Sequence, residues 1–89
     1  MRAIISVVGK DRPGIMALVS TECAKRNVNI VDISQTVLQE LFTMIMITEL
    51  DKNGDEFKEF VDYMKVMGEK EGLSINVMHE DIFNAMHKI

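Results

Sequence analysis

The chain repeats one pattern twice, and this repetition limits the available folds more than any other feature. In the first copy, the short β-branched run "AIISVV" at 3–8 predicts a strand. "KDRPG" at 10–14 interrupts the run, and an amphipathic helix follows. Asn27 can end this helix in a left-handed conformation, and "VNIVDISQTVL" at 28–38 predicts a second strand. The residues on the apolar face of the helix are Ile15, Leu18, Val19 and Cys23.

The second copy begins with "FTMIMITEL" at 42–50, which is apolar at nearly every position and predicts a central strand covered on both faces. "DKNG" comes next and is typical of a turn, and we expect Asn53 or Asp55 to cap the following helix. Gly72 should end that helix, and "LSINVMH" at 73–79 alternates as a half-exposed edge strand does. The apolar face of the helix contains Phe57, Phe60, Val61, Met64 and Met67.

The resulting order, βαββαβ, predicts an α+β, ferredoxin-like sandwich. Right-handed crossovers place both helices on one face of a four-stranded antiparallel sheet, with the first and third strands in the middle. We expect one domain over 1–89, with a core at 1–79 and an extension at 80–89 that forms a short helix. The apolar side of that helix would contain Ile82, Phe83, Met86 and Ile89.

The sheet face opposite the two long helices would expose isoleucine and methionine side chains. An apolar patch of this kind needs a cover, which the tail, a second subunit or another partner can supply. We therefore expect a homodimer, or a higher homo-oligomer, with symmetric contacts.

Composition narrows the function classes. The 89 residues carry a net charge of −4, which does not favour a nucleic-acid partner. The single cysteine, Cys23, rules out an intrachain disulfide, and its place on an apolar helix face predicts a core residue. Apolar stretches reach about six residues, far short of the roughly 20 that cross a bilayer. We expect a cytoplasmic protein with no membrane partner.

"KDRPG" is the strongest candidate for a ligand site. A helix that begins at Pro13 leaves the N–H groups of Gly14, Ile15 and Met16 without helical partners, and such groups bind carboxylate or phosphate. Gly14 lacks the Cβ that would block close approach, and Arg12 adds positive charge. The alternative is a plain turn in which Asp11 caps the helix and water satisfies the remaining groups.

Asn29 is the second candidate, because it begins the second strand and we expect that strand to return near "KDRPG". Its amide offers a donor and an acceptor together, although an outward polar residue on an edge strand would look the same. His79, Glu80, Asp81 and His87 cluster near the C-terminus without the spacing of a metal site. No catalytic group, metal or cofactor is therefore expected.

"VVGKDRPGIMALVS", "RNVNIVDISQTVL" and "FTMIMITEL", in this order of elements, resemble an ACT domain. More narrowly, the chain is similar to the small stand-alone bacterial ACT-domain proteins related to the glycine-cleavage regulators. Asp11, Pro13 and Gly14, together with Asn29 and Ile30 at the start of the second strand, carry the resemblance.

The resemblance implies a regulatory module that binds an amino acid between paired domains. The ligand carboxylate would lie on the N–H groups around Gly14 and Ile15, with side-chain contacts from Asp11 and Asn29. A second subunit would lie close to this site. The enzyme or DNA-binding module that ACT domains usually accompany is not found in the sequence, so a bound ligand would act through a separate partner protein.

Two other functions remain open. The same fold and dimer could serve as a structural or interaction module with no ligand. Acylphosphatases share this strand order and bind phosphate with an arginine in the first loop, a position that Arg12 fits. They also need an asparagine on the third strand, and 42–50 has none. RNA-binding and heavy-metal relatives of the fold would need strand aromatics or paired cysteines.

Overall fold

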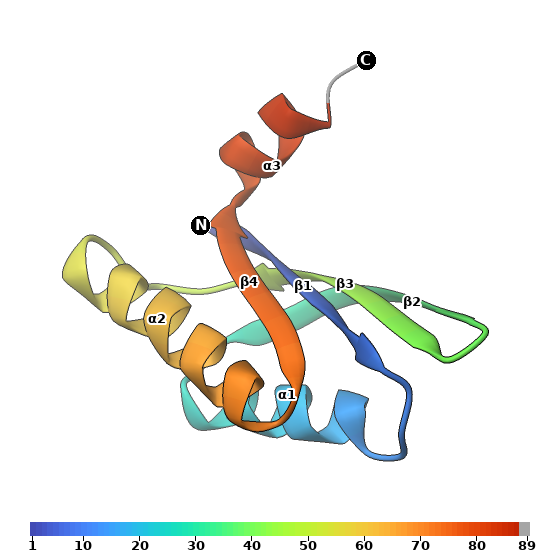
Figure 1. Ribbon diagram of the computed structural model, residues 1–89. Helices are drawn as coiled ribbons and strands as arrows, with labels where there is room; N and C mark the ends of the chain where they lie inside the picture. Colours follow the sequence, from blue (N-terminus) through green and yellow to red (C-terminus); the bar gives the residue numbers. More distant parts are fainter. Residues whose placement is uncertain (88–89) are drawn as a thin grey trace.

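The computed structural model describes residues 1–87 and contains seven elements joined by short turns (Figure 1). The predicted βαββαβ order is confirmed, and a third helix follows it. The elements are β1 (Arg2–Lys10), α1 (Ile15–Lys25), β2 (Asn29–Leu38), β3 (Leu41–Glu49), α2 (Asp55–Lys70), β4 (Leu73–His79) and α3 (Glu80–Met86).

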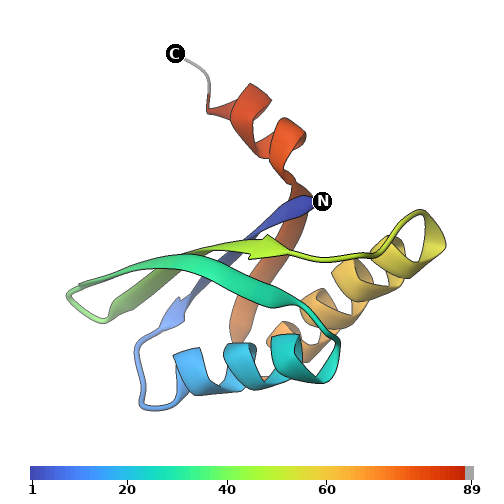
Figure 2. The same cartoon turned by 180° about the vertical axis from the view of Figure 1, so that it is seen from behind.

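The four strands form one antiparallel sheet in the order β2-β3-β1-β4, so the first and third strands are central as predicted. Helices α1 and α2 pack on one face of the sheet, and α3 lies on the other side (Figures 1 and 2). Because β1 and β2 both run antiparallel to β3, they run parallel to each other. The end of β1 and the end of β2 therefore lie at the same end of the sheet.

The hydrophobic core lies between the sheet and the two long helices. Alternation along β1 turns Ala3, Ile5 and Val7 into this layer, and all three are fully buried. The apolar faces predicted for both helices pack against them, and Val19 and Met64 are fully buried. Burying one such side chain stabilises the fold by about 1.5–3 kcal/mol, so the layer as a whole dominates stability.

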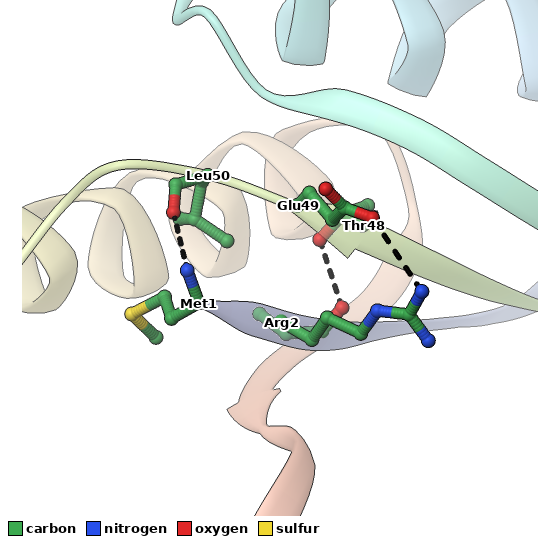
Figure 3. A network of polar contacts seen from close by, with 6 residues as sticks. Met1, Arg2, Thr48, Glu49 and Leu50 are labelled. Atoms are coloured by element: carbon green, nitrogen blue, oxygen red, sulfur yellow. Dashed lines mark hydrogen bonds and ion pairs between the residues drawn. The ribbon is translucent and has the colours of Figure 1, made fainter.

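Among residues 1–87, Thr48 is the one buried polar side chain of this core, and its hydroxyl donates a 2.8 Å hydrogen bond to the carbonyl oxygen of Ala3 (Figure 3). Two further contacts join β1 and β3 between this bond and the N-terminus. The amino group of Met1 donates to the carbonyl oxygen of Leu50 at 3.0 Å, and an exposed ion pair joins Arg2 to Glu49 at 3.5 Å (Figure 3). Thr48 is thus satisfied where it enters an apolar layer.

Helices α1 and α2 also contact each other through polar side chains. The hydroxyl of Tyr63 donates to a carboxylate oxygen of Glu22 at 2.9 Å. The guanidinium of Arg26 binds the same carboxylate oxygen at 3.2 Å and lies 3.5 Å from the centre of the Tyr63 ring. The hydrogen bond to Glu22 raises the pKa of Tyr63.

The helix ends confirm one predicted cap, correct a second and move the predicted start of α1. Asn27 adopts φ 58°, and the N–H of Val28 bonds to the carbonyl oxygen of Cys23, so α1 ends as predicted. The start of α2 is capped by Gly54, without any side-chain cap, and not by Asn53 or Asp55. At the start of α1, the prediction that Pro13 lies in the first helical turn is also wrong, because α1 begins only at Ile15.

The short C-terminal helix is confirmed as α3, Glu80–Met86. Its first N–H groups are capped by His79, whose Nδ1 accepts a 3.0 Å hydrogen bond from the N–H of Asp81. The ring of Phe83 stacks on that of His87 with 4.1 Å between their centres. Ile89, which we expected on the apolar side of this helix, lies outside the described residues.

Candidate functional site

The turn between β1 and α1 contains Pro13 and Gly14, and the backbone of Gly14 fits a type II turn. Gly14 adopts φ 88° and ψ 3°, which are the values required at the third position of such a turn, and Pro13 stands at the second position. The left-handed backbone favours glycine, since other residues pay about 1–2 kcal/mol there. The carbonyl oxygen of Gly14 accepts the first helical hydrogen bond, from the N–H of Leu18 at 2.9 Å.

This turn leaves a row of backbone donors free at the start of α1. Within residues 1–87, the N–H groups of Ile15, Met16 and Ala17 have no backbone acceptor, and no side chain caps the helix. The sequence-based alternative in which Asp11 caps α1 is therefore wrong. The set of free donors therefore begins one residue later than predicted, at Ile15 and not at Gly14, because the helix starts later than Pro13. The positive end of the helix dipole adds to their attraction for an anion.

The free donors border an open depression of about 460 Å³ between the turn and the end of β2. Its opposite wall comes from residues that sequence reasoning missed, and Val37 there leaves 49% of its surface exposed. The sequence signal that could have found these residues is weak. It is the strand alternation of β2, which turns residues 33, 35 and 37 to the side of the sheet where the helices lie, and it places the last of them past the start of α1. The lining residues are Asp11, Arg12, Gly14, Ile15, Met16, Gln35, Val37 and Phe42.

Arg12 is not free within this site. One of its guanidinium nitrogens donates to the backbone carbonyl oxygen of Glu71 at 3.1 Å and contacts the Glu71 carboxylate at 3.2 Å. Both side chains are more than 40% exposed, so the pair contributes about 0–1 kcal/mol. Arg12 therefore ties the β1–α1 turn to the C-terminal end of α2, and its charge is shared with Glu71. Asp11 is held by its backbone N–H, which donates to the carbonyl oxygen of Glu40 at 2.7 Å.

Asn29 lies at the other end of the sheet in the same chain. In the strand register, Asn29 of β2 pairs with Glu49 of β3, and Glu49 pairs with Arg2 at the start of β1. The turn follows Lys10, at the opposite end of β1. The two ends of β1 are about 27 Å apart at roughly 3.4 Å per residue. The prediction that strand 2 returns beside "KDRPG" is therefore wrong within one chain, because β2 begins at the far end and only its last residues reach the turn.

Ile30 lies next to Asn29 at the same end of β2 and is partly buried against the core. Of the seven predicted site residues, the structure gathers five consecutive ones, Asp11 to Ile15, at the turn. Asn29 and Ile30 are brought to a different place.

The other candidate residues, Cys23 and His79, have structural roles. Cys23 is fully buried, and burial raises the pKa of its thiol to about 11, so it is a core residue as predicted. His79 caps α3, as described above. Among residues 1–87, no group of three or more potential ligands is placed to hold a metal ion. No helix in the described part of the chain is long and apolar enough to cross a bilayer.

The sequence profile of the ACT domain matches residues 2–77. The chain belongs to the ACT-domain family. A UPF0237 protein of Methanosarcina acetivorans is 48% identical over 88 residues, which are 99% of this chain and 96% of that protein. A solved ACT domain protein from Streptococcus pneumoniae is 44% identical with a TM-score of 0.82, and the match covers 98% of each chain.

Family membership points to a regulatory, non-catalytic domain. A structure described as a possible glycine cleavage system transcriptional repressor has a TM-score of 0.72 but only 22% identity, and this chain covers 43% of it. That likeness shows the shared fold alone. The similar proteins come from archaea as well as bacteria, so the similarity does not assign the chain to a bacterium.

Proposed function

We propose that this ACT domain is a regulatory module that binds an amino acid as a homodimer, at the β1–α1 turn. The observation that carries the proposal is the left-handed Gly14, which leaves the N–H groups of Ile15, Met16 and Ala17 free beside an open depression. A carboxylate needs such donors, and the helix dipole favours its charge. The carboxylate of Asp11, which lines the same depression, suits the ligand ammonium group.

The dimer supplies the part of the site that one chain lacks. β2 is an edge strand, and its outer side has no partner strand among residues 1–87. If two β2 strands pair about a two-fold axis, they must run antiparallel. Pairing over the whole strand then sets Asn29 of one chain opposite Leu38 of the other. The bulge near Val31 can shift this register by one residue. The partner's Asn29 then reaches the end of the sheet where the depression lies.

Arg12 links the site to the rest of the domain. A ligand carboxylate competes with Glu71 for the guanidinium, since both are anions at the same turn. Exchange of this contact would release the β1–α1 turn from the end of α2. We infer that the ligand signals to a protein partner through this change, because the family is regulatory.

Isothermal titration of the protein with each of the twenty amino acids tests the proposal. We expect at least one to bind, and Gly14→Val to weaken its binding about tenfold or more by covering the donors and straining the turn. Gly54→Val is the matched control: Gly54 also has a positive φ of 53° and open space around its Cβ position, but lies at the start of α2. Circular dichroism checks that both variants fold.

Asn29→Ala should weaken binding while leaving the monomer fold intact. Gln35→Pro should abolish edge pairing and binding together, because the N–H of Gln35 faces the free edge of β2, whereas that of Thr36 pairs with Thr43 of β3. Absence of heat with all twenty amino acids would refute ligand binding and favour the purely structural module. Equal losses in Gly14→Val and Gly54→Val would show that the turn acts through stability alone.

A further inference from the structure

The sheet face opposite α1 and α2 is covered at one end only. The strand register places Ile4, Ile47 and Met78 side by side at the end where α3 lies. At the other end, past α3, Leu38 and Leu41 pair across the β2–β3 hairpin, and they leave 70% and 49% of their surfaces exposed. Single exposed apolar residues are ordinary, but neighbouring leucines with this exposure form a patch that water solvates poorly.

Helix α3 has exposed apolar side chains that need a packing partner. It contains only seven residues, too few to be stable in water without packing. Between α3 and its own sheet lies a crevice of about 220 Å³, lined by Phe83 and Met86 of α3 and by Ile4, Ile45 and Met78 of the sheet, among others. Ile82 and Met86, one turn apart, leave 56% and 65% of their surfaces exposed. α3 also projects from the end of β4 away from the sheet (Figures 1 and 2).

We propose that the two chains of a second, face-to-face dimer exchange these surfaces. The α3 helix of each copy docks in the partner's groove at the open end of the sheet face, which has a volume of about 440 Å³. The groove is lined by Gly9, Lys10, Leu38, Gln39, Glu40 and Leu41. A two-fold contact uses both surfaces twice, because each chain offers one α3 and one open groove.

Charge complementarity favours a second copy of this chain as the occupant. Lys10 lines the groove and makes no ion pair with any side chain of residues 1–87. α3 begins with Glu80 and Asp81, and the Asp81 side chain is 83% exposed. Glu40 also lines the groove, so the register of docking must bring the first turn of α3 to the Lys10 side. An acidic helix start near a lysine is attractive, although solvent screens the pair.

The packing distances allow this arrangement. A helix is about 10 Å thick, so two α3 helices side by side form one layer between two stacked sheets. Each sheet is then covered at one end by its own α3 and at the other end by the partner's α3. This contact uses the open sheet face, not the free edge of β2, so it does not depend on the proposed ligand site or its dimer.

Cysteine cross-linking between two differently tagged full-length chains tests the contact. The native Cys23 is fully buried, so an introduced thiol reacts alone in the folded protein. We expect Leu38→Cys mixed with Ile82→Cys to give an oxidised heterodimer about tenfold faster than Lys58→Cys mixed with Ile82→Cys. Lys58 is also exposed but lies on α2. Equal rates in the two mixtures would overturn the proposal.

Sedimentation equilibrium separates this contact from pairing at the β2 edge. We expect Ile82→Asp to raise the dissociation constant of one association step about tenfold or more, and Lys58→Asp to leave it unchanged. Lys10→Glu should weaken the step, and adding Asp81→Lys to that variant should restore part of it. A monomer at all concentrations would overturn the proposal, and so would association that Ile82→Asp leaves intact and Gln35→Pro abolishes.

Discussion

Gly68 in α2 provides a test in which helix propensity and packing predict opposite signs. Glycine inside a helix is less favourable than alanine by about 0.8–1.0 kcal/mol, so propensity alone predicts that Gly68→Ala stabilises the protein. The structure predicts the reverse. A Cβ at Gly68 would lie 2.7 Å from Cγ1 of Ile75 and 3.0 Å from the carbonyl oxygen of Leu73, which is backbone and cannot rotate away.

Overpacking of a core usually costs about 1–3 kcal/mol. Subtracting the propensity gain leaves about 0–2 kcal/mol. Because the 2.7 Å contact forces a neighbour to shift, we expect Gly68→Ala to lower the free energy of unfolding by the upper part of this range, about 1–2 kcal/mol. For a domain of this size, that change lowers Tm by roughly 4–15 °C. Because the N–H of Glu71 bonds to the carbonyl oxygen of Gly68, displacement of α2 should also disturb the Arg12 contact at the candidate site.

Urea unfolding followed by circular dichroism measures the change, with Asp62→Ala as the control. Asp62 is exposed on the same helix, so that variant reports propensity without a clash and should be slightly more stable than the native protein. A double-mutant cycle with Ile75→Val should show that the penalty depends on the Ile75 side chain. A stabilised Gly68→Ala variant would refute the packing argument.

Three further predictions concern the hairpin, the buried hydroxyl and the thiol. Gln39 turns the β2–β3 hairpin with φ 58°, so Gln39→Gly should raise the free energy of unfolding by about 0.5–1 kcal/mol in urea titrations. Thr48→Val keeps the side-chain shape but removes the hydrogen bond to Ala3, and calorimetry should show a loss of about 1 kcal/mol. Burial raises the pKa of Cys23 from its ordinary 9.0 to about 11, so the unfolded state releases this proton first as the pH rises. Stability should therefore fall between pH 9 and 11, by at most about 1.4 kcal/mol per pH unit, and Cys23→Ala should remove this part of the slope.

Several features follow from interactions between residues close in sequence, and these were predictable. The apolar spacing of α1 and α2 identified the residues that face the core, including Val19 and Met64. The left-handed conformation of Asn27 follows from its tolerance for positive φ at a helix end. A turn at 10–14 was also predicted, because proline and glycine side by side are typical of turns.

Where local signals compete, the sequence-based prediction was wrong in detail. Pro13 suits either the first turn of a helix or the second position of a type II turn, and both need the same φ. Gly14 decides between them by its positive φ, which moves the start of α1 to Ile15. In the same way, Asn53 and Asp55 are good caps by composition, yet Gly54 is the N-cap of α2.

The sequence by itself determined the order of elements, the core faces and the β1–α1 turn, because periodicity and turn chemistry act over a few residues. Only the tertiary structure decided which residues share the site. Strand register is non-local: it placed Asn29 at the far end of the sheet and brought Val37 and Gln35 to the turn instead. Strand order likewise left the edge of β2 free and one end of the sheet face open, and these surfaces are where a second copy of the chain would complete the molecule.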